Sequence, residues 1–341
     1  MKRWHLQWDF GTAEIISTAG ILKSCTFRLP SGGFFAPLAS APWSGRDDLG
    51  LELPGHMREL GGEFVCLPFG VGSMPSGLTP RWRTTACDFP QPLQHGICAD
   101  EEWELISSSQ THIELRIAYP NASDIHSVRR VIRADSASPA LDMQVSVYAR
   151  SPTELPFALH PIFRLPEQPS AVSIRIPFRC GFTYPAILPP GISRLAKDVE
   201  FDKLEAVPLA AGGSVEFSQL PQGPPAEEFL QLAGATGEAV ITYTDERARV
   251  RLTWDPRLLP SCLVWVSDRS LQEAPWCGRF RGLAIEPAAA AFDLPVDLAR
   301  RPNPISATGS PTALSVRPGQ PTVIAYRLAA EEVSEKLAAV F

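Results

Sequence analysis

Residues 281–293 read Arg-Gly-Leu-Ala-Ile-Glu-Pro-Ala-Ala-Ala-Ala-Phe-Asp and contain the carboxylate on which the interpretation of the chain depends. A short apolar run, Leu283 to Ile285, precedes Glu286 and Pro287, a pattern typical of a buried strand that leaves its sheet at the proline. A carboxylate at the last position of such a strand is partly desolvated, and desolvation raises its pKa. A raised pKa suits a general base that works near neutral pH.

The alternative to a catalytic role for Glu286 is a structural ion pair. Arg279 and Arg281 stand close to it in the sequence, and a carboxylate that faces an arginine often serves stability alone. Residues 281–293 by themselves favour this structural interpretation. Two other segments bear on the choice, because each places a histidine among apolar residues.

His95 lies in the segment Gln-Pro-Leu-Gln-His-Gly-Ile-Cys-Ala, residues 91–99, and His160 lies in Leu-Pro-Phe-Ala-Leu-His-Pro-Ile-Phe-Arg-Leu-Pro, residues 155–166. Imidazole titrates near neutral pH and is therefore a common partner in acid/base chemistry. A single histidine in an apolar strand is nevertheless more often a packed core residue than a catalyst. The remaining histidines occupy polar or alternating segments and are predicted to lie on the surface: His5, His56, His112 and His126.

Alternation of apolar and polar residues indicates strands over most of the chain. Between residues 141 and 148, for example, the apolar residues recur at every second position, as expected for a half-buried strand. The 34 prolines and 24 glycines are spread along the chain, which favours many short strands with short connections. Strand patterns occupy residues 13–17, 24–29, 112–119, 127–133, 141–148, 172–177, 238–244, 248–254, 261–266, 312–316 and 322–328.

The last thirteen residues, 329–341, differ from this pattern. They contain neither glycine nor proline and place Val333, Leu337 and Phe341 at helical spacing, which predicts a short C-terminal helix. The same alternating character runs through both halves of the chain, and no repeat or low-complexity tract marks a boundary. The sequence therefore predicts an all-β, mostly antiparallel fold in one domain that spans residues 1–341.

Composition limits the function classes. The chain has 341 residues with a formal net charge of −6, and no block of lysines and arginines predicts a nucleic-acid partner. The seven cysteines include no Cys-x-x-Cys pair, so neither a zinc site built from cysteines nor a disulfide framework is expected. The sequence has no apolar signal-peptide core after Met1 and no apolar stretch long enough to span a membrane. We expect a cytoplasmic protein that contacts no membrane and binds a neutral, hydroxyl-rich small molecule.

Three short motifs together resemble the aldose 1-epimerase (galactose mutarotase-like) family. They are Leu-Gln-His-Gly at residues 93–96 with Trp103 after it, Leu-His-Pro-Ile-Phe at residues 159–163, and Ala-Ile-Glu-Pro at residues 284–287. Residues 60–70 also resemble the glycine-rich segment of the hexose-6-phosphate mutarotase branch. The resemblance extends from about residue 13 to residue 328.

The resemblance implies a large antiparallel β-sandwich, the galactose mutarotase-like supersandwich, whose concave face binds a sugar. It implies that Glu286 is the catalytic base, that His160 is the catalytic acid, and that His95 binds and polarises the sugar. Anomer exchange needs a base for the proton of the C1 hydroxyl and an acid for the ring oxygen. This chemistry requires no redox step, so we expect neither a metal nor an organic cofactor.

The chain departs from the resembled branch at Leu60, where that branch has an arginine before the two glycines. The nearest arginine is Arg58, which becomes the candidate substrate arginine. The strand Leu-Val-Trp-Val at residues 263–266 resembles a family strand near the site, and its Trp265 is either a stacking platform for the sugar or a core residue. We expect a monomer or a homodimer.

Two other functions stay open from the sequence. The first is a catalytically silent carbohydrate-binding or regulatory module on the same fold, because fold does not fix function. The second is a β-sandwich domain of a polysaccharide-acting enzyme, although the single unit nearly fills the chain. The presence of both His160 and Glu286 favours the enzyme, since binding alone needs no acid/base pair.

Overall fold

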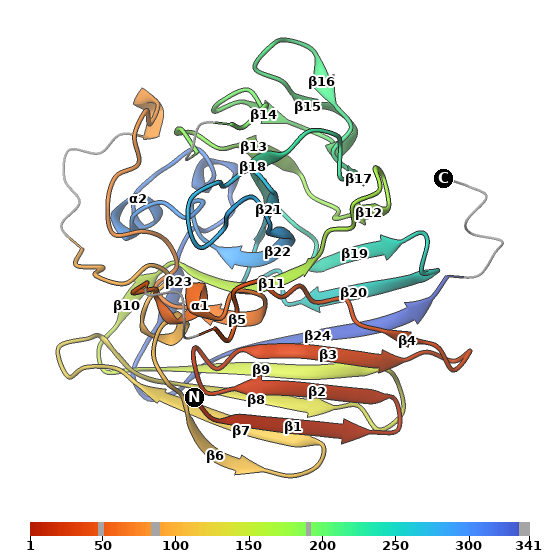
Figure 1. Ribbon diagram of the computed structural model, residues 1–341. Coiled ribbons are helices and arrows are strands. Elements are labelled where there is room, and N and C mark those ends of the chain that lie inside the picture. Colours follow the sequence, from red (N-terminus) through yellow and green to blue (C-terminus); the bar gives the residue numbers. More distant parts are fainter. Residues whose placement is uncertain (47–50, 83–88, 189–191, 334–341) are drawn as a thin grey trace.

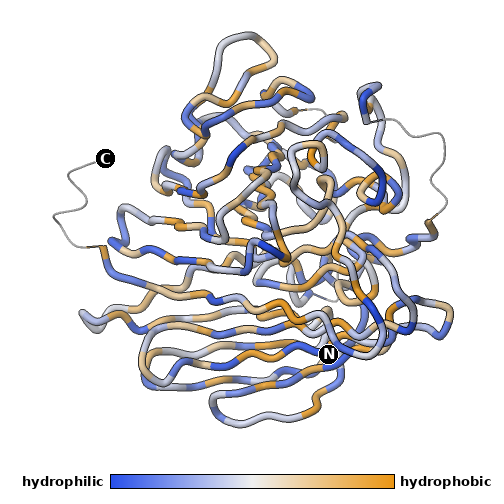
Figure 2. Tube along the Cα trace, turned by 180° about the vertical axis from the view of Figure 1, so that it is seen from behind, coloured by the Kyte–Doolittle hydropathy of each residue, from blue (hydrophilic) through white to orange (hydrophobic). Residues whose placement is uncertain are grey.

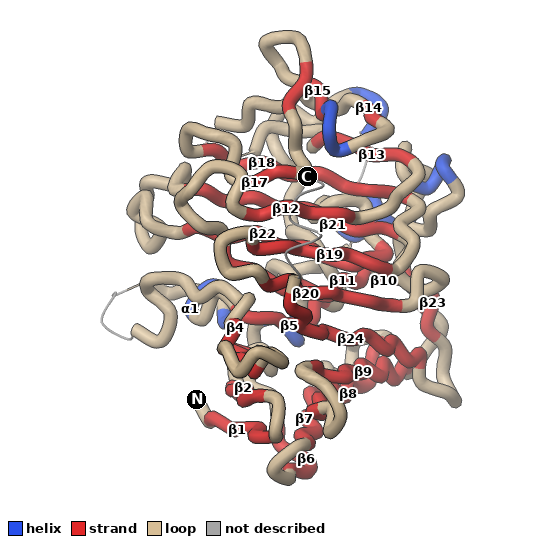
Figure 3. The backbone as a smooth tube through the Cα atoms, turned by 90° about the vertical axis from the view of Figure 1, so that its right-hand side faces the viewer, coloured by secondary structure: helices blue, strands red, loops and turns tan. Residues whose placement is uncertain are grey.

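The computed structural model describes residues 1–46, 51–82, 89–188 and 192–333. Within these ranges the chain is built mainly of antiparallel strands, and its helical segments are short (Figure 3). The helical segments are α1 (Gly55–Arg58), α2 (Val296–Arg300), and the 3-10 turns η1 (Pro80–Trp82), η2 (Ile97–Ala99), η3 (Leu204–Ala206) and η4 (Ser306–Thr308). The all-β class predicted from the alternating pattern is confirmed.

Two large sheets are formed by the described strands. The first sheet has eleven strands, in the order β1 (Arg3–Trp8), β2 (Gly11–Ile16), β3 (Leu22–Arg28), β5 (Gly62–Cys66), β11 (Phe157–Arg164), β22 (Arg281–Ala289), β21 (Ser261–Asp268), β18 (Ala226–Ala233), β13 (Cys180–Thr183) and β14 (Glu200–Phe201), with β4 (Phe34–Phe35) paired to β3. The second has nine, in the order β17 (Gln219–Leu220), β12 (Val172–Arg175), β19 (Glu238–Tyr243), β20 (Ala248–Trp254), β24 (Thr322–Glu332), β9 (Ala140–Ala149), β8 (Ile125–Ala134), β7 (His112–Ala118) and β6 (Glu104–Ser108).

Two small ribbons complete the described strands: β10 (Thr153–Leu155) with β23 (Leu314–Val316), and β15 (Val207–Pro208) with β16 (Ser214–Val215). The two large sheets lie face to face, with β1–β3 against β7–β9 in Figure 1. Among the described helices none has the length and apolar composition needed to cross a membrane.

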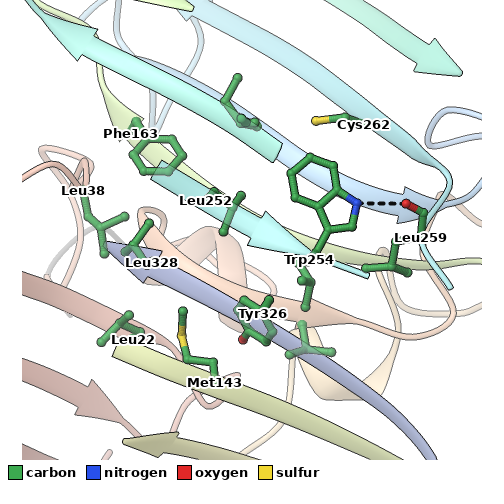
Figure 4. Packing of buried hydrophobic residues seen from close by; sticks show 14 of the residues in the cluster. Leu22, Leu38, Met143, Phe163, Leu252, Trp254, Leu259, Cys262, Tyr326 and Leu328 are labelled. Atoms are coloured by element: carbon green, nitrogen blue, oxygen red, sulfur yellow. Dashed lines mark hydrogen bonds between the residues drawn. The ribbon is translucent and has the colours of Figure 1, made fainter. Parts of the chain in front are cut away.

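The main hydrophobic core lies between the two sheets. Strands of the second sheet alternate apolar and polar residues along their length (Figure 2), and their apolar side chains point to this core. Trp254 of β20 packs here beside Leu252 and Cys262, and its indole nitrogen donates a hydrogen bond to the carbonyl oxygen of Leu259 over 2.9 Å (Figure 4). Burial of this contiguous apolar surface is the main force that holds the sheets together.

The central strands of the first sheet are buried on both faces. In β11 the side chains of Leu159 and Phe163 enter the core between the sheets, whereas Ala158 and Ile162 belong to a second apolar cluster on the opposite face. That opposite face, which carries Phe64 of β5 as well, is called the site face below. Strands covered on both faces show continuous apolar runs instead of alternation, which explains the apolar segments around His160 and Glu286.

A buried ion pair ties the two sheets together. Glu63 of β5 points away from the site face and pairs with the guanidinium of Arg130 from β8. The hydroxyl of Tyr326 from β24 donates a hydrogen bond to Oε1 of Glu63 over 3.0 Å, and Arg130 donates another to the carbonyl oxygen of Gly20 over 2.6 Å. Burial raises the pKa of Glu63, so its charge depends on Arg130 and Tyr326 for compensation.

Two expectations about element ends are wrong. Strand β22 does not end at Glu286 but runs on through Pro287 to Ala289. Residues 329–332 do not begin a helix: they continue β24 and pair with β20, because their alternating buried and exposed residues fit a strand. The rest of the predicted C-terminal helix, residues 334–341, lies outside the described residues.

Candidate functional site

The acid and base candidates lie side by side on the two central strands of the first sheet. In the ladder between β11 and β22, Ala158 pairs with Ala288, and this antiparallel register places His160 opposite Glu286. Both side chains point to the site face. Nε2 of His160 lies 3.4 Å from Oε1 of Glu286. Residues 126 positions apart in the sequence therefore form one contact.

The ion-pair alternative for Glu286 does not occur among the described residues. Arg281 instead pairs with Asp268 of β21, with 3.0 Å between its Nε and Oδ1, and Arg279 is exposed. The second carboxyl oxygen of Glu286, Oε2, is buried and has no hydrogen-bond partner in the described part of the chain. A buried unpaired acceptor is costly in a structural role, and it is available to a ligand hydroxyl.

Two prolines explain how Glu286 sits in mid-strand rather than at a strand end. Pro161 follows His160 on β11 and Pro287 follows Glu286 on β22, and neither has a backbone N–H to donate. The ladder between the two strands is interrupted at this point: it pairs Ala158 with Ala288 and resumes four residues later. The prolines therefore lie where the ladder hydrogen bonds are missing, beside the two site residues.

Burial controls the protonation of the pair. Glu286 is 1% exposed, and its pKa is raised well above its usual value by desolvation and then by the nearby charge of Asp293. Desolvation and the neighbouring His56 lower the pKa of His160 to about 3. Both shifts disfavour charge in a dry environment. A single proton shared between Oε1 of Glu286 and Nε2 of His160 therefore lies on the carboxyl group, next to a neutral imidazole.

His95 is presented to the same site by a tight loop. Its backbone has φ +61°, and its ring stacks on Phe69 with 4.8 Å between centroids. The loop is fixed because the N–H of His95 donates to the carbonyl oxygen of Gly70 over 2.9 Å. The ring centroid lies 5.7 Å from that of His160, so the three predicted residues converge. A Cβ at Gly96 would lie 2.1 Å from a backbone oxygen, which explains the glycine of this motif.

Trp265 lies at the edge of this cluster. It is half-buried on β21, and its ring centroid is 6.3 Å from that of His160. Its indole nitrogen donates a hydrogen bond to Glu227 of β18, which also accepts one from the hydroxyl of Ser270 over 2.6 Å. Burial raises the pKa of Glu227 to about 7. The indole is thus held in one orientation beside the site.

Among the described contacts, none joins Arg58 to the cluster. It is exposed at the end of α1, and its positive charge helps lower the pKa of Glu102. His56, on the same short helix, is instead buried, and its ring centroid lies 5.2 Å from that of His95. The prediction that His56 lies on the surface is wrong, because Gly55 lets α1 pack directly against the backbone of Asp100.

Two further site residues were not singled out from the sequence. Asp293 follows β22 within the quoted stretch, and a hydrogen bond from Tyr184 limits the rise of its pKa by desolvation to about 6. Gln231 of β18 holds the loop that carries Asp293: it donates to the carbonyl oxygen of Ala290 over 2.6 Å and accepts from the N–H of Phe292 over 2.5 Å. The one signal in the sequence that could have identified Asp293 is its place at the end of the apolar stretch that contains Glu286, seven residues after it.

Among the described residues, no group of three or more histidine, cysteine, aspartate or glutamate side chains is arranged to hold a metal ion. The site therefore consists of three imidazoles, two carboxyl groups and an indole around one contact between an acid and a base. Such a constellation can accept a proton at one atom and deliver a proton at another close by.

Solved structures with this fold are found in several organisms. A candidate aldose 1-epimerase from Escherichia coli K12 has a TM-score of 0.65 and 17% sequence identity, covering 97% of this chain and 99% of that chain. The GalM/aldose epimerase homologue from C. elegans has a TM-score of 0.63 and 12% identity, covering 98% and 99%. A galactose mutarotase-like protein from Lactobacillus casei has a TM-score of 0.60 and 12% identity, covering 97% and 100%.

These similarities show that the chain has the galactose mutarotase-like fold over nearly its whole length, as the resemblance of its motifs implied. A scan of family models and a search of curated proteins both give no match for the sequence.

Proposed function

We propose that the protein is an aldose 1-epimerase-like enzyme that interconverts the α and β anomers of an aldose by ring opening and reclosure. The observation that carries the proposal is the contact between His160 and Glu286, two buried titratable groups 3.4 Å apart on adjacent strands. The two reacting oxygens of a cyclic aldose, O1 and O5, are bonded to the same carbon. An acid and a base that act on them together must therefore lie close to each other, as these two side chains do.

The proposed reaction begins with a cyclic sugar whose O1 faces Glu286 and whose O5 faces His160. Glu286 takes the proton of the C1 hydroxyl, His160 gives a proton to O5, and the C1–O5 bond breaks to form the open-chain aldehyde. Rotation about the C1–C2 bond turns the other face of the aldehyde toward the O5 hydroxyl. Reclosure then reverses both proton transfers and forms the other anomer.

The proton inventory of the pair suits this cycle. Opening requires an ionised Glu286 and a protonated His160, and it leaves a protonated Glu286 and a neutral His160. The resting arrangement, with the proton on the carboxyl group, is the one from which ring closure starts. The direct contact of 3.4 Å lets the proton pass from Glu286 to His160 before opening. The reaction consumes no proton and needs neither a metal nor an organic cofactor.

His95 and Trp265 are the proposed substrate-binding residues. His95 offers an imidazole within the cluster, and Trp265 offers an indole face next to His160. Arg58 is exposed at the end of α1, on the same helix as His56, and its role as the substrate arginine stays a prediction. The protein is proposed to be one sugar-binding domain over residues 1–341, in a cytoplasmic monomer or homodimer; each of these points stays a prediction from the sequence.

The test is anomer exchange measured on a panel of free and phosphorylated aldoses, by polarimetry or proton NMR line shapes. We expect at least one aldose to exchange faster with the protein than without it, and Glu286→Gln to remove that acceleration. A protein that binds sugars and accelerates no exchange would favour the silent binding module on the same fold.

A further inference from the structure

His56 has its hydrogen-bonding character set by the backbone. Its Nδ1 lies 3.2 Å from the carbonyl oxygen of Ala99. A carbonyl oxygen only accepts, so Nδ1 must carry the ring proton and Nε2 must carry a lone pair. The residue is only 2% exposed, so water does not reach Nε2, and this atom has no hydrogen-bond partner in the described part of the chain. His56 therefore presents an unused acceptor inside the protein.

His95 has the opposite character. The N–H of Gly70 donates to its Nδ1 over 3.4 Å, and a backbone N–H only donates, so Nδ1 carries the lone pair and Nε2 carries the proton. The side-chain nitrogen of Gln94 is the atom placed 3.2 Å from Nε2 of His95. An amide nitrogen and an imidazole N–H both donate, so the bond from Gly70 implies that the Gln94 amide is turned by 180°, with its oxygen toward Nε2 of His95. Gln94 is exposed and can leave this position for a ligand.

The two rings are 5.2 Å apart between centroids and inclined at 67°, so a ring with an acceptor nitrogen and a ring with a donor nitrogen are neighbours. We propose that His56 and His95 form a binding site for one sugar hydroxyl, which receives a hydrogen bond from Nε2 of His95 and donates one to Nε2 of His56. The inference rests on the proposed function and adds His56 as a specificity-determining residue for it.

The charge states fit this arrangement over the physiological range. Burial lowers the pKa of His56 to about 4 and that of His95 well below its usual value. The groups that face His56 are Asp100, whose charge acts in the opposite direction, and the rings of His95 and His160, which titrate at low pH themselves. Both imidazoles are therefore neutral near pH 7, and each keeps one donor and one acceptor nitrogen.

The pair also selects a chemical class. A hydroxyl accepts and donates at one oxygen and satisfies both imidazoles. A phosphate or carboxylate oxygen only accepts, so it would leave the lone pair of His56 unpaired and facing a negative charge. An ammonium group only donates and would leave His95 unpaired. The part of the substrate that enters here is accordingly a neutral hydroxyl of an aldose.

The test compares two substitutions at one position. In His56→Asn the side-chain amide keeps the N–H toward Ala99 but has no acceptor at the place of Nε2, whereas His56→Gln puts an amide oxygen near that place. We expect His56→Asn to raise the KM of the preferred aldose roughly 10- to 100-fold with kcat much less changed, and His56→Gln to recover part of the loss. His126→Asn, at an exposed histidine of β8, is the matched control.

Deoxy sugars identify the hydroxyl. Among monodeoxy aldoses, one should bind the wild type as weakly as the parent sugar binds His56→Asn, and the substitution should cause no further loss for that analogue. Equal effects of His56→Asn on every analogue would mean a general disturbance of the site and would overturn the proposal.

A measurement without catalysis keeps this inference separate from the proposed function. In two-bond proton–nitrogen NMR spectra, a saturating aldose should shift the signal of the unprotonated Nε2 of His56, in the wild type and in Glu286→Gln alike. An aldose that binds and exchanges anomers while this signal and the KM of His56→Asn stay unchanged would overturn the inference and leave the proposed function standing. A protein that binds no aldose would overturn both.

Discussion

At the residue scale, Glu286 combines burial, an unpaired oxygen and a histidine neighbour, which a structural carboxylate does not need. Desolvation makes its ionised form unfavourable, and His160 is the group that can exchange a proton with it directly. The site residues found from the sequence were those in recognisable motifs with an apolar context. His56 and Asp293 were missed because burial through a single-turn helix or a loop leaves no periodic pattern in the sequence.

Replacing Glu286 by Gln keeps the size of the side chain and removes its role as a proton acceptor. We expect the rate of anomer exchange to fall by about 10²–10⁴-fold, with sugar binding retained. His160→Asn should cause a comparable loss, and the double variant should lose less than the product of the two, because acid and base act as one unit. Polarimetry gives the rates, and thermal melting checks the folded fraction. A folded Glu286→Gln protein with the wild-type rate would contradict the mechanism.

Asp293 is expected to influence how the rate of anomer exchange depends on pH. Its negative charge is the second cause, after burial, of the raised pKa of Glu286. Asp293→Asn removes that charge, so the pKa of Glu286 falls and its basic form persists to lower pH. Because the active pair holds one proton and loses it as the pH rises through the pKa of Glu286, we expect the basic limb of the pH–rate profile to move to lower pH, while the acidic limb changes less.

Tyr184→Phe offers a check on this interpretation. Loss of the hydroxyl removes a hydrogen bond that stabilises ionised Asp293, so the pKa of Asp293 rises and its charge disappears over a wider range of pH. The basic limb should therefore move in the same direction as in Asp293→Asn, but less. Basic limbs that coincide with the wild type in both variants would show that Asp293 does not tune Glu286.

At the scale of elements, the strands of the second sheet could be predicted because one face of the sheet is buried in the core and the other faces solvent. The alternation in β9 and β20 marks them residue by residue. The central strands of the first sheet give no such pattern, since both of their faces are buried. The continuation of β22 past Pro287 could not be predicted either. It is possible because the ladder between β22 and β11 is interrupted at this point, so the missing N–H of the proline costs no hydrogen bond there.

The loop after β22 depends on one side chain for its position. Gln231 satisfies the carbonyl oxygen of Ala290 and the N–H of Phe292, both in the interior. Gln231→Met has a similar volume and makes neither bond, so it should lower the free energy of unfolding by about 1–3 kcal/mol for each backbone group left unpaired. Urea unfolding measures this loss. Because the loop carries Asp293, the pH–rate profile should change as well; a stability loss with an unaltered profile would separate the loop from catalysis.

At the scale of the whole molecule, two sheets enclose the main core, and the site lies on the far face of the first. The sequence could not predict which face of β5 or β11 packs against the second sheet. Both faces of these strands are buried, and each face carries a titratable side chain as well as apolar ones. Glu63 points between the sheets and His160, one strand away, points to the site. The contact that decides this arrangement joins residues 67 positions apart and has no local pattern.

The ion pair between Glu63 and Arg130 tests how firmly the sheets are joined. Both side chains are at most 1% exposed, so removing one partner leaves an uncompensated charge in the core. Arg130→Met should therefore lower the free energy of unfolding by about 3–5 kcal/mol. Adding Glu63→Gln removes the orphaned charge, and Tyr326 still donates its hydrogen bond to the amide oxygen, so the double variant should regain most of the loss.

Urea unfolding of the two single variants and the double variant gives the coupling energy between Glu63 and Arg130. The control is Arg327→Met, which removes a half-exposed arginine that pairs with Asp142 at 2.6 Å and with Asp135, and it should cost about 1 kcal/mol or less because the pairs are open to solvent. Single and double variants with equal stability would mean that Glu63 takes up a proton when Arg130 is absent, in accord with the raised pKa that burial gives it. In that case the loss in Arg130→Met should shrink as the pH falls, because protonation of Glu63 then costs less free energy.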